Sequence, residues 1–472
     1  MKNVRRPTRL VLGLMLTIGG LIAGTGGVVI VGGPAGADSC APTPIAAINA
    51  TAPGQTFQGV GCYNISGDLI ITKSNITISG GVWNIAGGMT VKGSSDTISG
   101  ATLHVNTNWA AVSPFYNRPL VISGQRNIFE GDTVTVPAGV QIKGTSTTLD
   151  GGSYTNPSTT GVVGPGGVGS YKPIILVRDT NSATISNLSI TGAGDGTYHS
   201  SKVNEAGIKL ETSDSDRIIN VTTANTFGDG LELVADLPHH VVGVTRLFLD
   251  GITVTNAGRH GITLAEVGTP TAAAGSAGAA QYQSTLNYVN VQSAALWAVN
   301  FESDIPTEGS GYVTMNNVTA AVGSAGFAVQ ELLTGPIAIN NLNGGGHLYD
   351  SSMGNVSPPP VTLDGGTWAL PPNDTLLWKA GLEVLGGVLT VKNMTLNRQP
   401  TVGGGVPTGY AAWISLAQNP ANPTQTGGVL QLINTTVTDP TGSRTDAYST
   451  CGSIGPVYAG DATYAPCTAP IN

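Results

Sequence analysis

The residues best suited to proton transfer stand in two short, glycine-flanked turns. Asp229 lies in Gly228-Asp-Gly230, and Arg259 and His260 lie in Gly258-Arg-His-Gly261. A carboxylate and an imidazole can exchange protons with a reacting group, and a nearby cation can neutralise a developing anion. Such chemistry requires the two turns to lie side by side in space. The elements that position the turns therefore decide whether these residues form a site.

Short runs in which apolar and polar residues alternate surround both turns, as in Asn75-Ile-Thr-Ile-Ser-Gly80 and Val140-Gln-Ile-Lys-Gly144. A period of two residues is typical of β-strands, and Gly, Asn, Asp and Ser separate the runs as turn residues do. Convincing helical patterns are nearly absent beyond the N-terminal segment. The chain is therefore expected to be all-β.

One strand recurs along the middle of the chain, and its central residues are Ile208, Leu231, Ile262, Val299 and Val329, at spacings of 23, 31, 37 and 30 residues. The extra length falls just after this strand each time, at 236–243, 268–281 and 303–310. Insertions at equivalent points of successive repeats stack on one face of a solenoid. We therefore predict a single-stranded, right-handed parallel β-helix whose inward Ile, Val and Leu stack from coil to coil, with Asn stacked at the turns.

Alignment of the repeats gives two columns of candidate binding residues. The outward column on the recurring strand consists of Lys209, Glu232, Thr263, Asn300 and Gln330. The turn before that strand contributes Ala206, Asp229, His260, Trp297 and Phe327, with Arg259 beside His260. A groove between the stacked insertions and the outward column would suit an extended sugar chain, and the spacing allows contact between Asp229 and His260.

A structural explanation of the turn column stays open beside the functional one. Strict alternation puts Asp229, His260, Trp297 and Phe327 in phase with the inward residues. The aromatic side chains would then belong to the core, and His260 would cap a turn.

Two segments carry a family resemblance, Phe227-Gly-Asp-Gly-Leu-Glu-Leu233 and Asn256-Ala-Gly-Arg-His-Gly-Ile-Thr-Leu264. Through them the chain resembles the pectin-lyase-like superfamily of right-handed β-helices, over roughly residues 65–440 as architecture. The resemblance implies a lyase, hydrolase or epimerase that acts on polysaccharides, or a protein that only binds them. A shared fold does not decide between these activities.

The turn around His260 looks like the Gly-His-Gly turn of polygalacturonase-type hydrolases, and Asp229 occupies a turn similar to one of their aspartate turns. Only these two residues match. The paired adjacent aspartates and the later Arg-Ile-Lys element of those hydrolases are missing. Hydrolysis needs two carboxylates about 5 to 9.5 Å apart, and no second carboxylate aligns with Asp229 in the neighbouring repeats.

Charge and composition narrow the partners. The sequence has 20 Lys and Arg against 28 Asp and Glu, so a nucleic-acid partner is not expected. The excess of acidic residues also disfavours a polyuronate as the ligand, because the two negative charges repel each other unless bound calcium bridges them. Asp214 and Asp216 could bind calcium, although two carboxylates in a Ser-rich turn are more often a solvated turn. No cysteine or other metal motif indicates a metal site, and no motif indicates an oligomeric state.

The two ends of the chain are predicted to be a signal peptide with a cap at the N-terminus and a disulfide-closed tail at the C-terminus. A charged start, an apolar run over 10–31 and Ala35-Gly-Ala37 predict a cleaved signal peptide over residues 1–37, with an uncleaved membrane anchor as the alternative. The signal peptide predicts that the protein is secreted or displayed at the cell surface. No other segment of the sequence is expected to span a membrane. We expect a cap at 38–64, the β-helix at 65–445 and a disulfide-closed tail at 446–472. Disulfides are predicted between Cys40 and Cys62 and between Cys451 and Cys467.

Two functions remain open from the sequence. The first is a secreted polysaccharide-active enzyme with Asp229, Arg259 and His260 as catalytic residues, in which His260, Arg259 or Lys209 would be the base of a lyase. The stacked insertions and the Arg-His turn favour it. The second is a surface or adhesion protein that binds glycan without catalysis or serves as a rigid spacer. The incomplete catalytic set favours the second.

Overall fold

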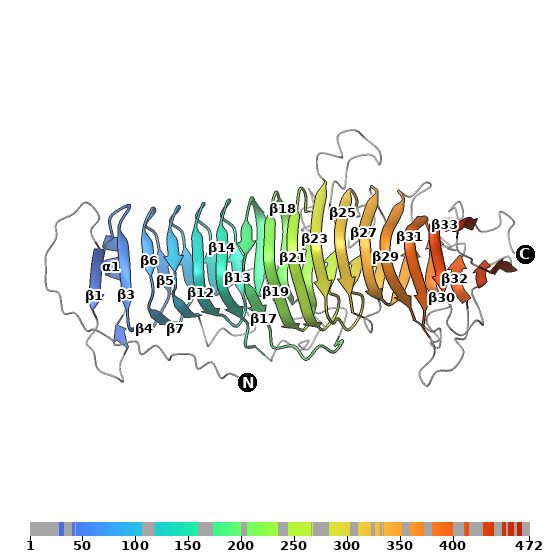
Figure 1. Cartoon of the computed structure of the whole chain (residues 1–472). Coiled ribbons are helices and arrows are strands. Elements are labelled where there is room, and N and C mark those ends of the chain that lie inside the picture. Colours follow the sequence, from blue (N-terminus) through green and yellow to red (C-terminus); the bar gives the residue numbers. More distant parts are fainter. Residues whose placement is uncertain are drawn as a thin grey trace, which may run out of the picture.

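The computed structural model describes residues 28–32, 40–42, 44–105, 119–158, 173–199, 205–234, 244–265, 267, 283–302, 310–321, 326–330, 333, 335–351, 359–371, 380–399, 410–414, 428–438, 446–449, 452–456 and 460–464. Successive coils of short strands stack along one axis into an elongated solenoid (Figure 1). Nearly all the strand pairs are parallel. The predicted all-β parallel β-helix is confirmed.

The strands form two sheets. Sheet A contains β1 Val28–Gly32, β2 Ala41–Pro42, β3 Thr56–Val60, β4 Cys62–Ile65, β6 Thr77–Ser79, β7 Val82–Ile85, β9 Thr97–Ser99, β10 Thr102–Val105, β12 Ile128–Thr135, β14 Thr148–Thr155, β16 Thr184–Ser186, β17 Ser189–Thr191, β19 Arg217–Thr226, β21 Phe248–Ala257, β23 Ser284–Val291, β25 Val313–Ala320, β27 Ile337–Gly345, β29 Val361–Leu370, β31 Val388–Arg398, β33 Val429–Thr438 and β36 Gly460–Tyr464.

Sheet B contains β5 Leu69–Ile71, β8 Met89–Val91, β11 Leu120–Ile122, β13 Val140–Ile142, β15 Ile175–Asn181, β18 Ala206–Asp214, β20 Asp229–Val234, β22 Ile262–Leu264, β24 Val299–Phe301, β26 Gly326–Val329, β28 His347–Ser351, β30 Ala380–Gly386, β32 Tyr410–Ile414, β34 Asp446–Ser449 and β35 Gly452–Pro456. Each coil contributes one strand to sheet B and then a strand or strand pair to sheet A. The inward side chains of both sheets form one continuous core.

The register of sheet B confirms most of the predicted repeat. Ile208 pairs with Leu231, Leu231 with Ile262, and Ile262 with Val299. The last step was wrong, because Val299 pairs with Phe327 and not with Val329. A shift of two residues keeps the same side chains facing inward, so alternation alone cannot detect it.

Most residues with a left-handed backbone at the corners between strands are Gly, Asn or Ser, although Arg126, Thr212 and Arg246 also adopt it. One corner of sheet A carries an Asn or Gly with positive φ in coil after coil, and its amides stack, as Asn341 Nδ2 donates to Asn317 Oδ1 at 2.8 Å. The predicted stacking of Asn at the turns is confirmed. In another corner, a Cβ added to Gly124 would lie 1.6 Å from the carbonyl oxygen of Gly93, so the coils meet there through bare backbone.

Both ends of the solenoid are covered. At the N-terminal end, helix α1 (Ile45–Ala50) buries Ile48, and the predicted Cys40–Cys62 disulfide is present. At the C-terminal end, β36 pairs antiparallel with β33 and β35 pairs antiparallel with β34. This reversal ends the parallel stack and occupies the open edges.

Several predictions for the ends lie outside the described residues. Cys451 and Cys467 are among them, as is most of the predicted signal peptide, of which β1 is the described part and pairs with β3. Among the residues that the structure describes, no helix is both long and apolar enough to span a membrane.

Candidate functional site

The outward column of sheet B is polar and buried. Lys209, Glu232, Thr263 and Asn300 pair in successive strands as predicted, and each is at most 6% exposed. Lys209 Nζ lies 3.1 Å from Glu232 Oε1. Buried charges are normally paired in this way, because an isolated one is costly to desolvate.

Gln330 was placed in this column wrongly. The two-residue register shift puts Ala328 opposite Asn300. Gln330 nevertheless contacts the column, because its side-chain amide donates a hydrogen bond to Asn300 Oδ1.

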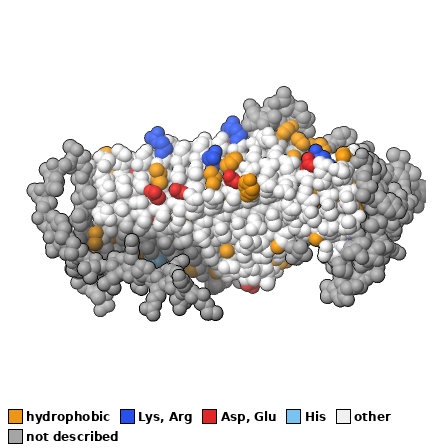
Figure 2. Space-filling view, in the orientation of Figure 1, with side chains coloured by type: hydrophobic (Ala, Val, Ile, Leu, Met, Phe, Trp, Pro, Cys, Tyr) orange, Lys and Arg blue, Asp and Glu red, His pale blue; other side chains and the backbone are white. Residues whose placement is uncertain are grey.

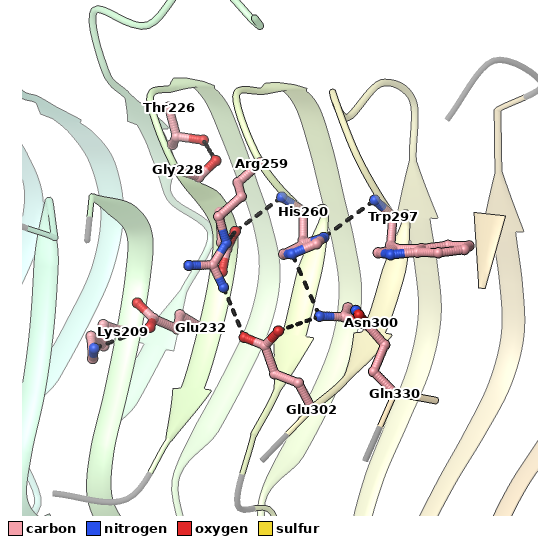
Figure 3. A network of polar contacts seen from close by, with 11 residues as sticks. Lys209, Thr226, Gly228, Glu232, Arg259, His260, Trp297, Asn300, Glu302 and Gln330 are labelled. Atoms are coloured by element: carbon pink, nitrogen blue, oxygen red, sulfur yellow. Dashed lines mark hydrogen bonds and ion pairs between the residues drawn. The ribbon is translucent and has the colours of Figure 1, made fainter. Parts of the chain in front are cut away.

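Arg259 joins carboxylates from two different coils (Figure 3). Its Nε lies 3.1 Å from Asp229 Oδ1, and its Nη2 lies 2.8 Å from Glu302 Oε1. Glu302 also accepts a hydrogen bond of 2.7 Å from Asn300 Nδ2. We call Asp229, Arg259 and Glu302 the carboxylate–arginine cluster. No carboxylate of a neighbouring coil aligns with Asp229, but Glu302 reaches the same guanidinium from two coils away.

Glu302 escaped the sequence analysis because it follows β24 and lies outside the aligned columns. The one available signal was its place two residues after Asn300, on the same outward side of an extended chain. Its side chain is 21% exposed, whereas those of Arg259 and Asp229 are 11% and 2% exposed. Glu302 is therefore the member of the cluster most open to a ligand.

His260 bridges the coils on either side of it. Its backbone N–H donates to Asp229 Oδ1 at 2.9 Å, and its ring Nδ1 accepts the backbone N–H of Trp297 at 3.2 Å. The predicted contact with Asp229 exists, but through the backbone and not through the imidazole. Burial, together with the nearby Arg259 guanidinium, lowers the pKa of His260 well below its usual value.

The imidazole of His260 is therefore neutral at ordinary pH. Since Nδ1 accepts a hydrogen bond, the ring proton resides on Nε2, which lies 3.5 Å from the side-chain nitrogen of Asn300. A base needs an available lone pair, and this tautomer offers none. The geometry favours His260 as a residue that holds the turns together over His260 as a proton acceptor.

Phe327 was placed in the turn column wrongly, because the register shift pairs it with Val299 on the strand itself, whereas Trp297 stands before β24 as predicted. Phe327 belongs to the hydrophobic core and packs edge-on against Phe301, with ring centroids 5.8 Å apart. Trp297 is 6% exposed and stacks on Tyr349 at 5.9 Å. The core explanation therefore holds for Phe327, while Trp297 lies over the outward side of sheet B beside Asn300 (Figure 3).

The two aspartates considered for calcium are occupied by protein donors. Asp214 is paired with Arg246 and accepts the Thr245 hydroxyl at 2.6 Å. Asp216 accepts the backbone N–H of Ala183 at 2.8 Å. Within the described ranges, no group of three or more His, Cys, Asp or Glu side chains is arranged to hold a metal ion.

No protein-family model and no curated protein matches the sequence. Similar solved structures include the Dettilon tailspike protein, at 11% identity and a TM-score of 0.38, which covers 77% of this chain and 62% of that chain. A tailspike double mutant of E. coli bacteriophage HK620 has 11% identity and a TM-score of 0.42, covering 86% and 73%. Polygalacturonase from Erwinia carotovora has 12% identity and a TM-score of 0.34, covering 78% and 92%.

Proposed function

We propose that this chain is an exported protein that binds an extended polysaccharide along the outward side of sheet B and cleaves it beside the carboxylate–arginine cluster. The observation that carries the proposal is the bridge from Asp229 through Arg259 to Glu302. It brings two carboxylates from separate coils to the Nε and Nη2 atoms of one planar guanidinium. Glycoside hydrolysis uses two carboxylates about 5 to 9.5 Å apart, one on each side of the bond that is cleaved.

The members of the cluster differ in what they can do. Glu302 is the most exposed and would meet the sugar or the attacking water. Asp229 is buried and fixed by the His260 backbone, so it would orient Arg259 and balance its charge. Gln330 would contact the sugar chain through its side-chain amide, whereas Asn300 is fully buried and would hold Glu302 and Gln330 in position.

A non-catalytic glycan-binding function is the second candidate, and one observation favours it. Both carboxylates of the cluster are already paired with Arg259, and His260 is neutral with Nδ1 engaged. A group that gives a proton to the leaving oxygen is therefore not evident in this arrangement, and hydrolysis requires one. The same polar surface would still bind a sugar chain.

Glu302→Gln separates the two functions, because glutamine keeps the size of the side chain and removes its charge. We expect the wild-type protein to release reducing ends from at least one polysaccharide in a panel. Glu302→Gln is expected to lower that rate by about 100-fold or more while glycan binding persists. Asp364→Asn is the matched control, because it removes one carboxylate of an ion pair, with Lys392, on sheet A.

Binding without any reducing ends or unsaturated product, with and without calcium, would establish the non-catalytic function. If the wild-type protein neither binds nor cleaves any polysaccharide, both functions are wrong. Cleavage that survives unchanged in Glu302→Gln and Asp229→Asn would move the reaction to another part of the chain.

A further inference from the structure

One corner of sheet A follows a strict residue pattern with a single exception. The register of the strands aligns eleven consecutive positions, each with positive φ: Gly131, Gly151, Asn187, Asn220, Gly251, Tyr288, Asn317, Asn341, Gly365, Asn393 and Asn434. Gly or Asn occupies every one of these aligned positions except position 288, where a tyrosine stands.

Folding does not explain the tyrosine. A left-handed backbone suits Gly, which has no Cβ, and Asn, whose short amide bonds locally, whereas a bulky residue is strained there. Tyr288 has φ of 50° and is 63% exposed. Its ring therefore gains little from burial to offset the strain. Backbone strain of this kind collects at sites of function, where an outside contact supplies the compensation.

The surroundings of Tyr288 define what that contact would be. A row of amides, Asn287, Asn316 and Asn340, runs beside it and is linked by hydrogen bonds of 2.8 Å. Gly251 precedes Tyr288 in the corner, so bare backbone flanks the ring on that side.

The charge near this corner is small and negative. Asp250 aligns with Asn287 on the preceding strand, and most of the face formed by the long strands is uncharged (Figure 2). An anionic polymer would meet a carboxylate there without a compensating cation from the amide row. An uncharged ligand with an apolar face and many hydroxyls fits the ring and the amides together, since the ring packs on the apolar face and the amides bond to the hydroxyls.

We propose that Tyr288 and the amide row of Asn287, Asn316 and Asn340 form a second glycan-binding site, which takes an uncharged polysaccharide. The site lies on sheet A, apart from the carboxylate–arginine cluster of sheet B. It would hold a polymer surface against the outside of the solenoid. The inference does not rest on cleavage at Glu302, and the two sites can be tested separately.

The test uses affinity electrophoresis of the mature protein in native gels that contain a soluble β-glucan, a xylan or a galactomannan. The wild-type protein is expected to be retarded by at least one of them. Tyr288→Asn installs the residue type usual at this corner, so the variant is expected to fold with a higher midpoint of thermal unfolding. Its affinity for the retarding polysaccharide should fall about tenfold, as expected for the loss of one aromatic contact.

Tyr288→Trp keeps an aromatic ring and should retain binding. Tyr198→Asn is the matched control, because Tyr198 is 47% exposed and has no positive φ, and it should change neither retardation nor stability. Glu302→Gln should be retarded like the wild-type protein, which separates this site from the proposed reaction.

Equal retardation of Tyr288→Asn and the wild-type protein would overturn the proposal, as would absence of retardation by every neutral polysaccharide. A concentration-dependent dimer of the wild-type protein that disappears in Tyr288→Asn, without any glycan retardation, would instead assign the ring to contact between copies of the chain.

Discussion

Asp216 offers a direct test of how buried carboxylates join the coils. It is 2% exposed, and its Oδ1 accepts the Ala183 backbone N–H from the preceding coil. Burial, helped by the charge of Asp214, raises the pKa of Asp216 from 3.8 to about 7. Asp96 and Asp132 accept backbone N–H groups of neighbouring coils in the same way.

The raised pKa of Asp216 makes the free energy of unfolding depend on pH. Because its pKa is higher in the folded protein, Asp216 holds its proton more tightly there than in the unfolded chain. The group therefore lowers the free energy of unfolding as pH rises from about 4 to about 7. A shift of roughly three units corresponds to a loss on the order of 4 kcal/mol, as an upper limit.

Asp216→Asn removes this pH dependence, because asparagine resembles the protonated acid and keeps an oxygen for the Ala183 N–H. Guanidinium titrations of both proteins at about pH 4 and about pH 8 give the free energies of unfolding. Compared with the wild-type protein, the variant should be of similar stability at the lower pH and more stable by up to about 4 kcal/mol at the higher pH.

The other titrating groups are common to both proteins, so the difference between them isolates Asp216. A stability difference that stays the same at both pH values would refute this reasoning. So would a variant that is less stable at the higher pH. Either result would mean that the buried carboxylate is ionised without penalty.

Two further predictions concern the packing of the coils and the N-terminal end. Gly124→Ala places a Cβ against the Gly93 carbonyl and should lower the free energy of unfolding by about 3 kcal/mol or more. Gly67→Ala is the control, because a Cβ at Gly67 meets nothing within 4 Å. Equal stability of the two variants would contradict the close contact between Gly124 and Gly93. The Cys40–Cys62 disulfide joins residues 22 apart. Replacing both cysteines by serine should lower the free energy of unfolding by about 3 kcal/mol. An unchanged melting curve by calorimetry would show that the crosslink adds no stability.

The sequence alone determined the features that depend on local pattern. The alternation of apolar and polar residues predicted that the side chains of Ile208, Leu231 and Ile262 face inward. The spacing of these residues predicted the successive coils of a β-helix. The stacking of Asn at the turns followed from the expected coils, and the structure gives these residues a left-handed backbone. The Cys40–Cys62 pair followed from their place at one end of the chain.

Only the tertiary structure decided the features that depend on how separate coils align. Val299 pairs with Phe327 and not with Val329, and a two-residue shift leaves the alternation unchanged. Long side chains reach beyond their own coil, so Glu302 meets Arg259 although the two residues share no repeat position. The proton position on His260 likewise depends on the Trp297 backbone in the next coil. Such contacts join residues about one or two coils apart, and no local pattern encodes them.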